Sequence, residues 1–130
     1  HRDLHSFPTR RSSDLSGPGQ FRVPHSLRVA KDGRVYVCDR ENHRVQVFSP
    51  DGQFLDQWTD FKFPMGIHID DNQIVYVTDQ VPRLSIYTLD GELLARGRTF
   101  ENCHNVYTDS RGYLYGVDTA NQRVQKFAKV

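Results

Sequence analysis

Short runs of alternating hydrophobic and polar residues recur along the chain, separated by turn residues. In one stretch these runs are SLRV (26–29), RVYVCD (34–39), RVQVF (44–48) and FLDQW (54–58). Alternation with a period of two places successive side chains on opposite faces of a β-strand. Asp-Gly pairs at 32–33 and 51–52 separate the runs and are typical of hairpin turns. The pattern therefore predicts four short antiparallel strands within about 40 residues.

The same pattern occurs three times, with a period of 39 or 40 residues. Five columns are in register: Pro24, Pro64 and Cys103; Tyr36, Tyr76 and Tyr115; Asp39, Asp79 and Asp118; Arg44, Arg83 and Arg123; Phe48, Tyr87 and Phe127. A repeat of this length with four strands is typical of a β-propeller blade. The third copy ends after RVQKF without a fourth-strand segment. We therefore predict an all-β chain that forms three consecutive blades, about 20–60, 61–100 and 101–130, with four, four and three strands.

A polar segment follows the second strand of the first and third copies. Asp39, Asn42 and Arg44 recur as Asp118, Asn121 and Arg123. Short polar side chains of this kind bond to nearby backbone groups and stabilise turns. We expect these residues to close the turn between strands two and three by side-chain-to-backbone hydrogen bonds, which is a structural role.

The first fifteen residues differ from the rest of the chain, because they are basic and serine-rich and have no hydrophobic period. This composition fits a transit peptide. The nine residues FPTRRSSDL (7–15) instead resemble the translation of a short-read sequencing adapter. We favour the adapter, treat residues 1–15 as a non-native segment outside the fold, and expect 16–130 to be the C-terminal part of a longer protein.

Composition narrows the function classes. The chain has 130 residues, 37% of them hydrophobic, and a net charge of +1, which fits one ordinary domain. Lysine and arginine are scattered, so no nucleic-acid partner is expected, and no apolar run reaches the roughly 18 residues of a membrane span. Cys38 and Cys103 lack CxxC spacing, which indicates neither a zinc knuckle nor a disulfide framework. Nothing in the sequence indicates a cellular compartment.

Two histidines occupy the same column of the repeat. His25 in VPHSL and His104 in NCHNV are two blades apart, and Met65 fills the column between them. The first strands of propeller blades surround one axis, so equivalent positions converge on the channel and can assemble a metal site. The alternative is that both histidines are structural and bond to loop backbone. His68, three residues past the column, is expected to be a strand residue that makes channel or inter-blade contacts rather than a third ligand.

The repeat resembles the NHL family of β-propellers over residues 20–130. PGQFRVPHSL followed by DRENHRVQVF is similar to the catalytic propeller of the peptidyl-α-hydroxyglycine α-amidating lyase family, which implies a six-bladed parent. The resemblance implies a substrate in the channel, a peptide or another small molecule. In that family the substrate is a peptide ending in α-hydroxyglycine, and the products are a peptide amide and glyoxylate.

The resemblance also implies a metal and its ligands. It implies zinc in the parent, with His25 and His104 as metal ligands. Asn105 stands where the family has an acidic calcium ligand, which argues against structural calcium. The third zinc ligand and the catalytic residues fall outside the matched region, so the fragment alone is expected to be inactive. The competing expectation is a non-catalytic propeller that serves as an interaction platform, because a fold does not specify chemistry.

Overall fold

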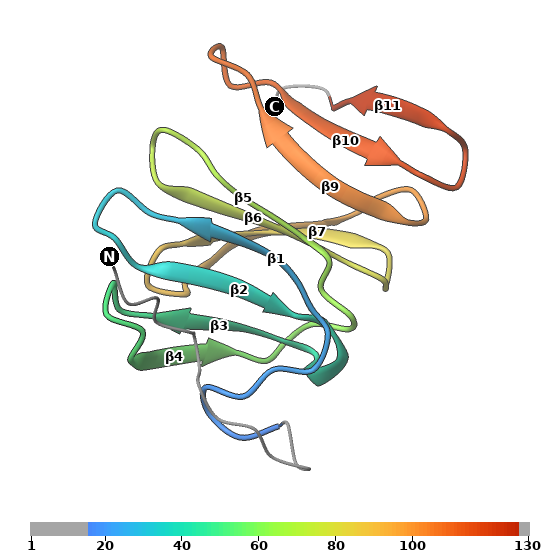
Figure 1. Cartoon of the computed structure of the whole chain (residues 1–130). Helices are drawn as coiled ribbons and strands as arrows, with labels where there is room; N and C mark the ends of the chain where they lie inside the picture. Colours follow the sequence, from blue (N-terminus) through green and yellow to red (C-terminus); the bar gives the residue numbers. More distant parts are fainter. Residues whose placement is uncertain (1–15, 128–130) are drawn as a thin grey trace, which may run out of the picture.

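Three antiparallel sheets make up the computed structural model, which describes residues 16–127 (Figure 1). Blade 1 contains β1 (Pro24–Val29), β2 (Val35–Asp39), β3 (Arg44–Phe48) and β4 (Phe54–Trp58). Blade 2 contains β5 (Gly66–Ile69), β6 (Ile74–Asp79), β7 (Arg83–Thr88) and β8 (Leu93–Arg98). Blade 3 contains β9 (Cys103–Thr108), β10 (Leu114–Asp118) and β11 (Arg123–Lys126). The predicted four, four and three strands are confirmed.

Within each sheet every strand pairs with the next one along the chain. The strand boundaries follow the hydrophobic alternation closely. β1 begins two residues earlier than expected, at Pro24, and its pairing with β2 is irregular between Pro24 and Ser26. A single 3-10 turn, Arg40–Asn42, connects β2 to β3. The part of the chain that the structure describes has no helix of the length and hydrophobicity needed to cross a membrane.

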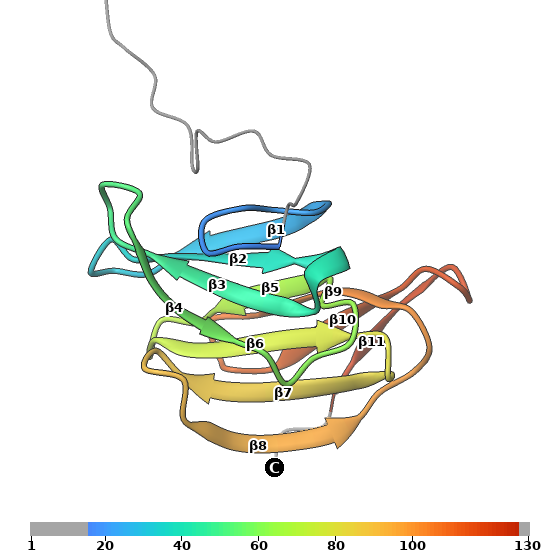
Figure 2. The same ribbon diagram turned by 90° about the horizontal axis from the view of Figure 1, so that it is seen from below.

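Blade 2 lies between blades 1 and 3, and the first strand of each blade contacts the first strand of the next (Figures 1 and 2). At the junction of blades 1 and 2, Tyr36 and Val45 pack in one cluster with Ile67 and Val75. The junction of blades 2 and 3 holds a smaller cluster, formed by Leu84, Cys103 and Val106. Successive apolar residues, as in β2, therefore supply both faces of a sheet, one for each neighbouring blade.

A buried aspartate ties each of the first two blades to the chain segment that leads into it. Asp39, fully buried, accepts hydrogen bonds from Arg44 Nε at 2.8 Å and Asn42 Nδ2 at 2.9 Å. It also accepts one from the backbone N–H of Arg22, before β1, at 2.8 Å. In blade 1 this carboxylate therefore links two side chains of the turn to the backbone of the incoming segment.

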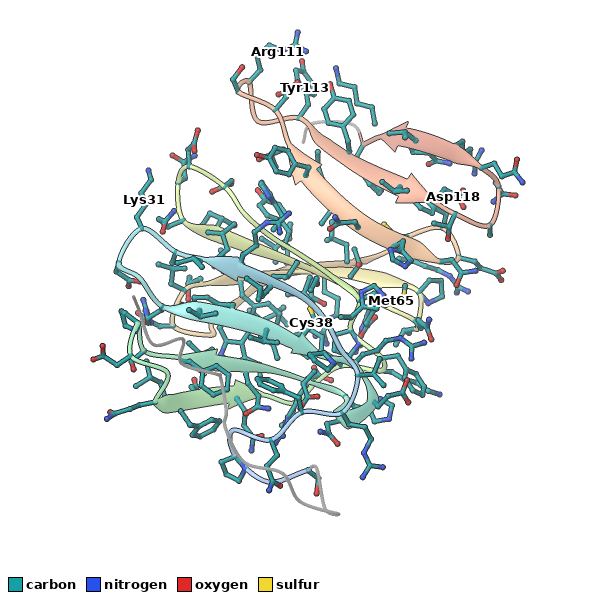
Figure 3. All side chains as sticks on the ribbon, in the orientation of Figure 1. Lys31, Cys38, Met65, Arg111, Tyr113 and Asp118 are labelled. Atoms are coloured by element: carbon teal, nitrogen blue, oxygen red, sulfur yellow. The ribbon has the colours of Figure 1, made fainter. Side chains whose placement is uncertain are left out.

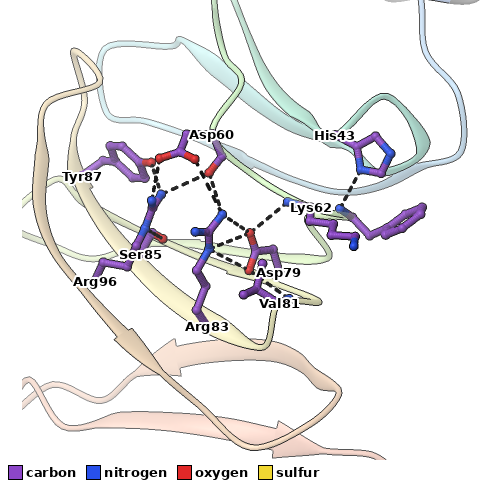
Figure 4. Close-up of polar contacts among 10 residues, drawn as sticks. His43, Asp60, Lys62, Asp79, Val81, Arg83, Ser85, Tyr87 and Arg96 are labelled. Carbon is purple, nitrogen blue, oxygen red and sulfur yellow. Dashed lines mark hydrogen bonds and ion pairs between the residues drawn. The ribbon is translucent and has the colours of Figure 1, made fainter.

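The aspartate of blade 2 binds its incoming segment as that of blade 1 does, whereas the aspartate of blade 3 binds the turn that follows it. In blade 2, Asp79 pairs with Arg83 and accepts from the backbone N–H of Lys62 at 3.0 Å (Figure 4). In blade 3, Asp118 pairs with Arg123 and accepts from the backbone N–H of Asn121 at 3.2 Å, as the sequence predicted. The predictions for residues 1–15 concern positions outside the described residues.

Candidate functional site

The histidine column lies at one end of the blades. His25 and His104 are the second residues of β1 and β9, and Met65 directly precedes β5. The hairpins that follow these first strands turn at the other end, which Figure 3 marks with Lys31 and Arg111, well apart from Met65. The three column positions thus form one rim of the prospective channel.

The two imidazoles from blades 1 and 3 are in contact. Their ring centroids are 4.7 Å apart and the planes meet at 61°, an edge-on arrangement. His25 is half-buried and His104 is exposed, so both rings are accessible from the rim. Residues 79 positions apart in the sequence are therefore brought together, as the repeat predicted.

The ring of His25 is held by the backbone of the intervening blade. Its Nδ1 lies 3.0 Å from the carbonyl oxygen of Met65, and Ser26 Oγ donates to the same oxygen at 2.5 Å. Because a carbonyl oxygen only accepts, Nδ1 carries the proton and Nε2 keeps its lone pair. Histidines that bind metals characteristically donate the other ring nitrogen to a carbonyl or carboxylate in this way.

The electrostatics of His104 favour the neutral ring. Partial desolvation by neighbouring atoms lowers the pKa of His104, and the nearby His25 and Arg40 lower it further because a second positive charge is unfavourable there. The neutral imidazole is the form that binds a metal ion. At neutral pH His104 is therefore available as a ligand.

Gly66 allows the rim to be this narrow. A Cβ atom at this position would lie 2.8 Å from Asn105 Cα and 2.9 Å from the carbonyl oxygen of His104. β5 and β9 consequently approach closely just below the two histidines. Neither Gly66 nor Ser26 was identified from the sequence. The available signal was that this column of the repeat holds Ser26 in the first copy and Asn105 in the third, but glycine in the second.

The backbone that enters each rim position is strained. Val23, Phe63 and Asn102 occupy one column and have φ of 52°, 52° and 56°. Left-handed φ is unfavourable for side chains such as those of Val23 and Phe63. Strain of this kind accumulates where a chain must direct particular residues, as at binding sites.

The residues present fit two ligands of a metal ion. Within residues 16–127, no three His, Cys, Asp or Glu side chains are placed together to hold one. Cys103 is fully buried, and burial raises the pKa of its thiol to about 12, so it does not offer a thiolate. Asn105 Oδ1 accepts from the backbone N–H of Val106.

Two other histidines serve the packing of the blades. His68 is buried between blades 2 and 3, as expected, with Nε2 2.8 Å from Thr108 Oγ1 and its ring 4.2 Å from that of Tyr107. His43 follows the 3-10 turn of blade 1 and is half-buried. His43 Nδ1 accepts from the backbone N–H of Phe63 at 3.1 Å, and the two rings pack edge-on (Figure 4).

Sequence comparison relates the chain to propeller proteins. Residues 21–48 match the family model described as "NHL repeat". Peptidyl-glycine alpha-amidating monooxygenase B of Xenopus laevis is 33% identical over 136 aligned residues, which cover 90% of this chain and 15% of that protein. The human E3 ubiquitin-protein ligase TRIM32 is 34% identical over 102 aligned residues, covering 65% of this chain and 16% of the ligase. The chain thus spans less than a fifth of either relative.

Comparison with solved structures supports the same architecture. Virginiamycin B lyase from Staphylococcus aureus matches with a TM-score of 0.62 and 16% identity, over 78% of this chain and 39% of that one. At this identity the likeness concerns the fold alone. Taken with the repeat match and the three sheets, it shows that this chain forms three blades of an NHL-repeat β-propeller.

Proposed function

We propose that this chain is part of a zinc-dependent, lyase-like propeller in which His25 and His104 hold the metal ion. The observation that carries the proposal is the contact of two imidazoles from blades 1 and 3 at one rim. Similarity to the Xenopus amidating monooxygenase over 90% of the chain supports the same assignment. The substrate would be a peptide ending in α-hydroxyglycine, cleaved to a peptide amide and glyoxylate.

The chain's own residues have defined parts in this proposal. His25 presents Nε2 because Met65 holds Nδ1, and partial desolvation and nearby positive charge lower the pKa of His104, which favours its neutral ring. A bound zinc ion acts as a Lewis acid that polarises a substrate oxygen, and it needs about three protein ligands with one open position. His25 and His104 are this chain's share of that ligand set.

Zinc titration of the 130-residue chain tests the assignment. We expect weak binding that either His25→Ala or His104→Ala reduces at least tenfold. His43→Asn is the matched control, because asparagine tolerates the left-handed backbone at this position (φ 54°) and its amide oxygen can still accept from Phe63. Unchanged zinc affinity in both alanine variants would mean that the histidines are structural. In a complete protein, the same two substitutions should abolish glyoxylate release.

The second candidate function is an interaction platform. It is favoured by similarity to TRIM32, an E3 ubiquitin-protein ligase, and by the apolar side chains exposed on the terminal blades, such as Leu27 and Val124. Such a propeller has no need for paired imidazoles at equivalent strand starts. The zinc titration therefore separates the two candidates, since only the lyase-like propeller loses metal binding on substitution.

A further inference from the structure

A buried tryptophan fills the outer part of the junction between blades 1 and 2. Trp58, at the end of β4, is 7% exposed and stacks on Tyr87 of blade 2, with the ring centroids 4.9 Å apart. The ring of Tyr36, in its own blade, lies 5.5 Å from it. An indole ring is therefore part of the packing that joins blades 1 and 2.

Blade 2 has glycine at the equivalent position. Trp58 pairs with Val45 of β3, and Gly97 of β8 pairs with Leu84 of β7, which is the corresponding pair of the repeat. A Cβ atom at Gly97 would have no neighbouring heavy atom within 4 Å, apart from those of the adjacent residues. The junction of blades 2 and 3 therefore has an empty space where the previous junction holds an indole ring.

A cavity of about 520 Å³ lies at this position, between two blades that the chain contains. Its walls include the repeat equivalents of three residues that pack in one cluster with Trp58. These are Tyr76, Leu84 and Phe127, which correspond to Tyr36, Val45 and Tyr87. The cavity volume is within the range of about 300–1,000 Å³ that is typical of small-molecule sites. The walls that receive an aromatic ring in one junction are thus present in the other.

We propose that this cavity binds a planar aromatic molecule of one or two rings. The ring takes the place that the Trp58 side chain occupies one junction earlier, and it contacts aromatic and aliphatic walls of the same kind. Burial of apolar surface and offset or edge-on contacts between rings stabilise the complex. None of the residues that line the cavity belongs to the histidine rim, so this site is separate from the proposed metal site.

The charges at the cavity favour an uncharged or anionic ligand. Arg96 and Arg98 line it, and no acidic residue of the described chain does so. Arg96 pairs with Asp60, whereas Arg98 has no acidic partner within residues 16–127. A cationic aromatic molecule would be repelled by this charge, so it should bind more weakly than an anionic one of similar size.

The test titrates the 130-residue chain with indole, indoleacetate and tryptamine and follows its backbone amide signals by NMR, without added metal. We expect indole to shift the signals of Gly97 and Gly112, which line the cavity, until they saturate. The signal of Gly91, which lies against Trp58 in the other junction, should stay in place. Indoleacetate should bind at least as tightly as indole, and tryptamine more weakly than either.

Filling the cavity should abolish this binding. Gly97→Trp should weaken indole binding by about tenfold or more, because it supplies the side chain that packs at the equivalent position of blade 1. The backbone of Gly97 is not left-handed, so a strand at this position accepts a larger residue. Leu94→Trp is the matched control, because it adds the same side chain to β8 at a position that is 50% exposed and outside the cavity. It should leave the affinity for indole unchanged. Gly97→Leu repeats the test if the tryptophan variant does not fold.

Three results would overturn the proposal. Undiminished affinity in the variants at Gly97 would mean that indole binds elsewhere. Amide signals that do not move at millimolar indole would mean that the cavity holds only water or a protein segment. Tryptamine as the tightest ligand would contradict the assigned class of ligand. Zinc is absent from this experiment, so its failure is distinct from failure of the proposed metal site.

Discussion

Gly66 sets the distance between two strands at the histidine rim. Added side-chain atoms there would meet backbone on one side and Thr78 Oγ1 at 2.8 Å on the other. Contacts this short require the backbone to shift, because neither neighbour is the end of a flexible side chain. A single hydrogen atom in place of a methyl group therefore determines how close β5 and β9 can lie.

Replacing Gly66 by alanine should destabilise the chain by about 1–3 kcal/mol, the usual cost of overpacking a close-packed site. Urea unfolding followed by circular dichroism measures this directly. Gly97→Ala is the matched control, since Gly97 also lies in a strand and a Cβ there would have no atom within 4 Å. Equal stability of the two variants would contradict the conclusion that Gly66 permits the close approach of β5 and β9.

The contribution of an aspartate–arginine pair to the stability of its blade depends on how far the pair is buried. Arg44 is buried, and besides Asp39 it donates to Gln57 Oε1 and to the carbonyl oxygens of Gly17 and Gln20. Arg123 makes the equivalent pair with Asp118, but half of its side chain is exposed. The same two residue types therefore form a fully buried pair in blade 1 and, in blade 3, a pair whose aspartate is buried and whose arginine is half exposed.

Arg44→Ala should cost about 3–5 kcal/mol, because it leaves the carboxylate of Asp39 buried without a counter-charge. Arg123→Ala should cost less than Arg44→Ala, because half of the Arg123 side chain is exposed and water can enter the space that it leaves beside Asp118. Chemical denaturation of the two variants, compared with the parent chain, provides the measurement. A similar loss in both would show that burial does not decide the contribution of these pairs.

Local sequence predicted the strands well, and it predicted the site only in part. Each strand follows from alternation and turn residues within a few positions, which is why β3 and β4 match their expected bounds. The shared repeat column predicted that His25 and His104 meet. The bond from His25 to the backbone of Met65 could not be predicted, because the orientation of a backbone carbonyl group cannot be read from the sequence. The contact of His43 could not be predicted either, because its partner, Phe63, lies twenty residues away in another linker.

At the scale of the whole molecule, His68 links the packing of blades 2 and 3 to pH. Its side chain lies on β5 and contacts Thr108 and Tyr107 of β9. Burial lowers its pKa, the positive charge of Arg28 lowers it further, and Asp70 and Asp71 oppose both effects. The Nδ1 atom of His68 is buried without a hydrogen-bond partner, so the folded state disfavours the doubly protonated ring.

The free energy of unfolding should therefore decrease as the pH falls below about 6.5, where the unfolded chain takes up a proton that folded His68 resists. Above that pH the contribution is fully present and the stability should be level. Urea unfolding between about pH 7.5 and 5.5 measures the slope, in a range where ordinary carboxylates stay ionised.

His68→Phe should flatten this slope, since phenylalanine keeps the ring packing and cannot titrate. Part of the slope should remain, because the pKa of His104 is lowered in the same direction. His104→Gln in the His68→Phe background should reduce the slope further. A parent chain whose stability did not change over this range would be inconsistent with neutral burial of His68.

The bonds from Asp39 and Asp79 to their incoming segments also define what one duplicated unit must contain. Arg83 donates to the carbonyl oxygen of Asp60, and Asp79 accepts from the N–H of Lys62, so both halves of these bonds lie within residues 60–98. A unit with those limits contains the bonds that tie its incoming segment to its sheet, and it meets its neighbours through apolar faces and a few polar contacts, such as that of His68 with Thr108. Gene duplication can therefore lengthen such a chain by one blade at a time. Each new blade adds one rim position, which can hold an ordinary side chain, as at Met65, or a metal ligand.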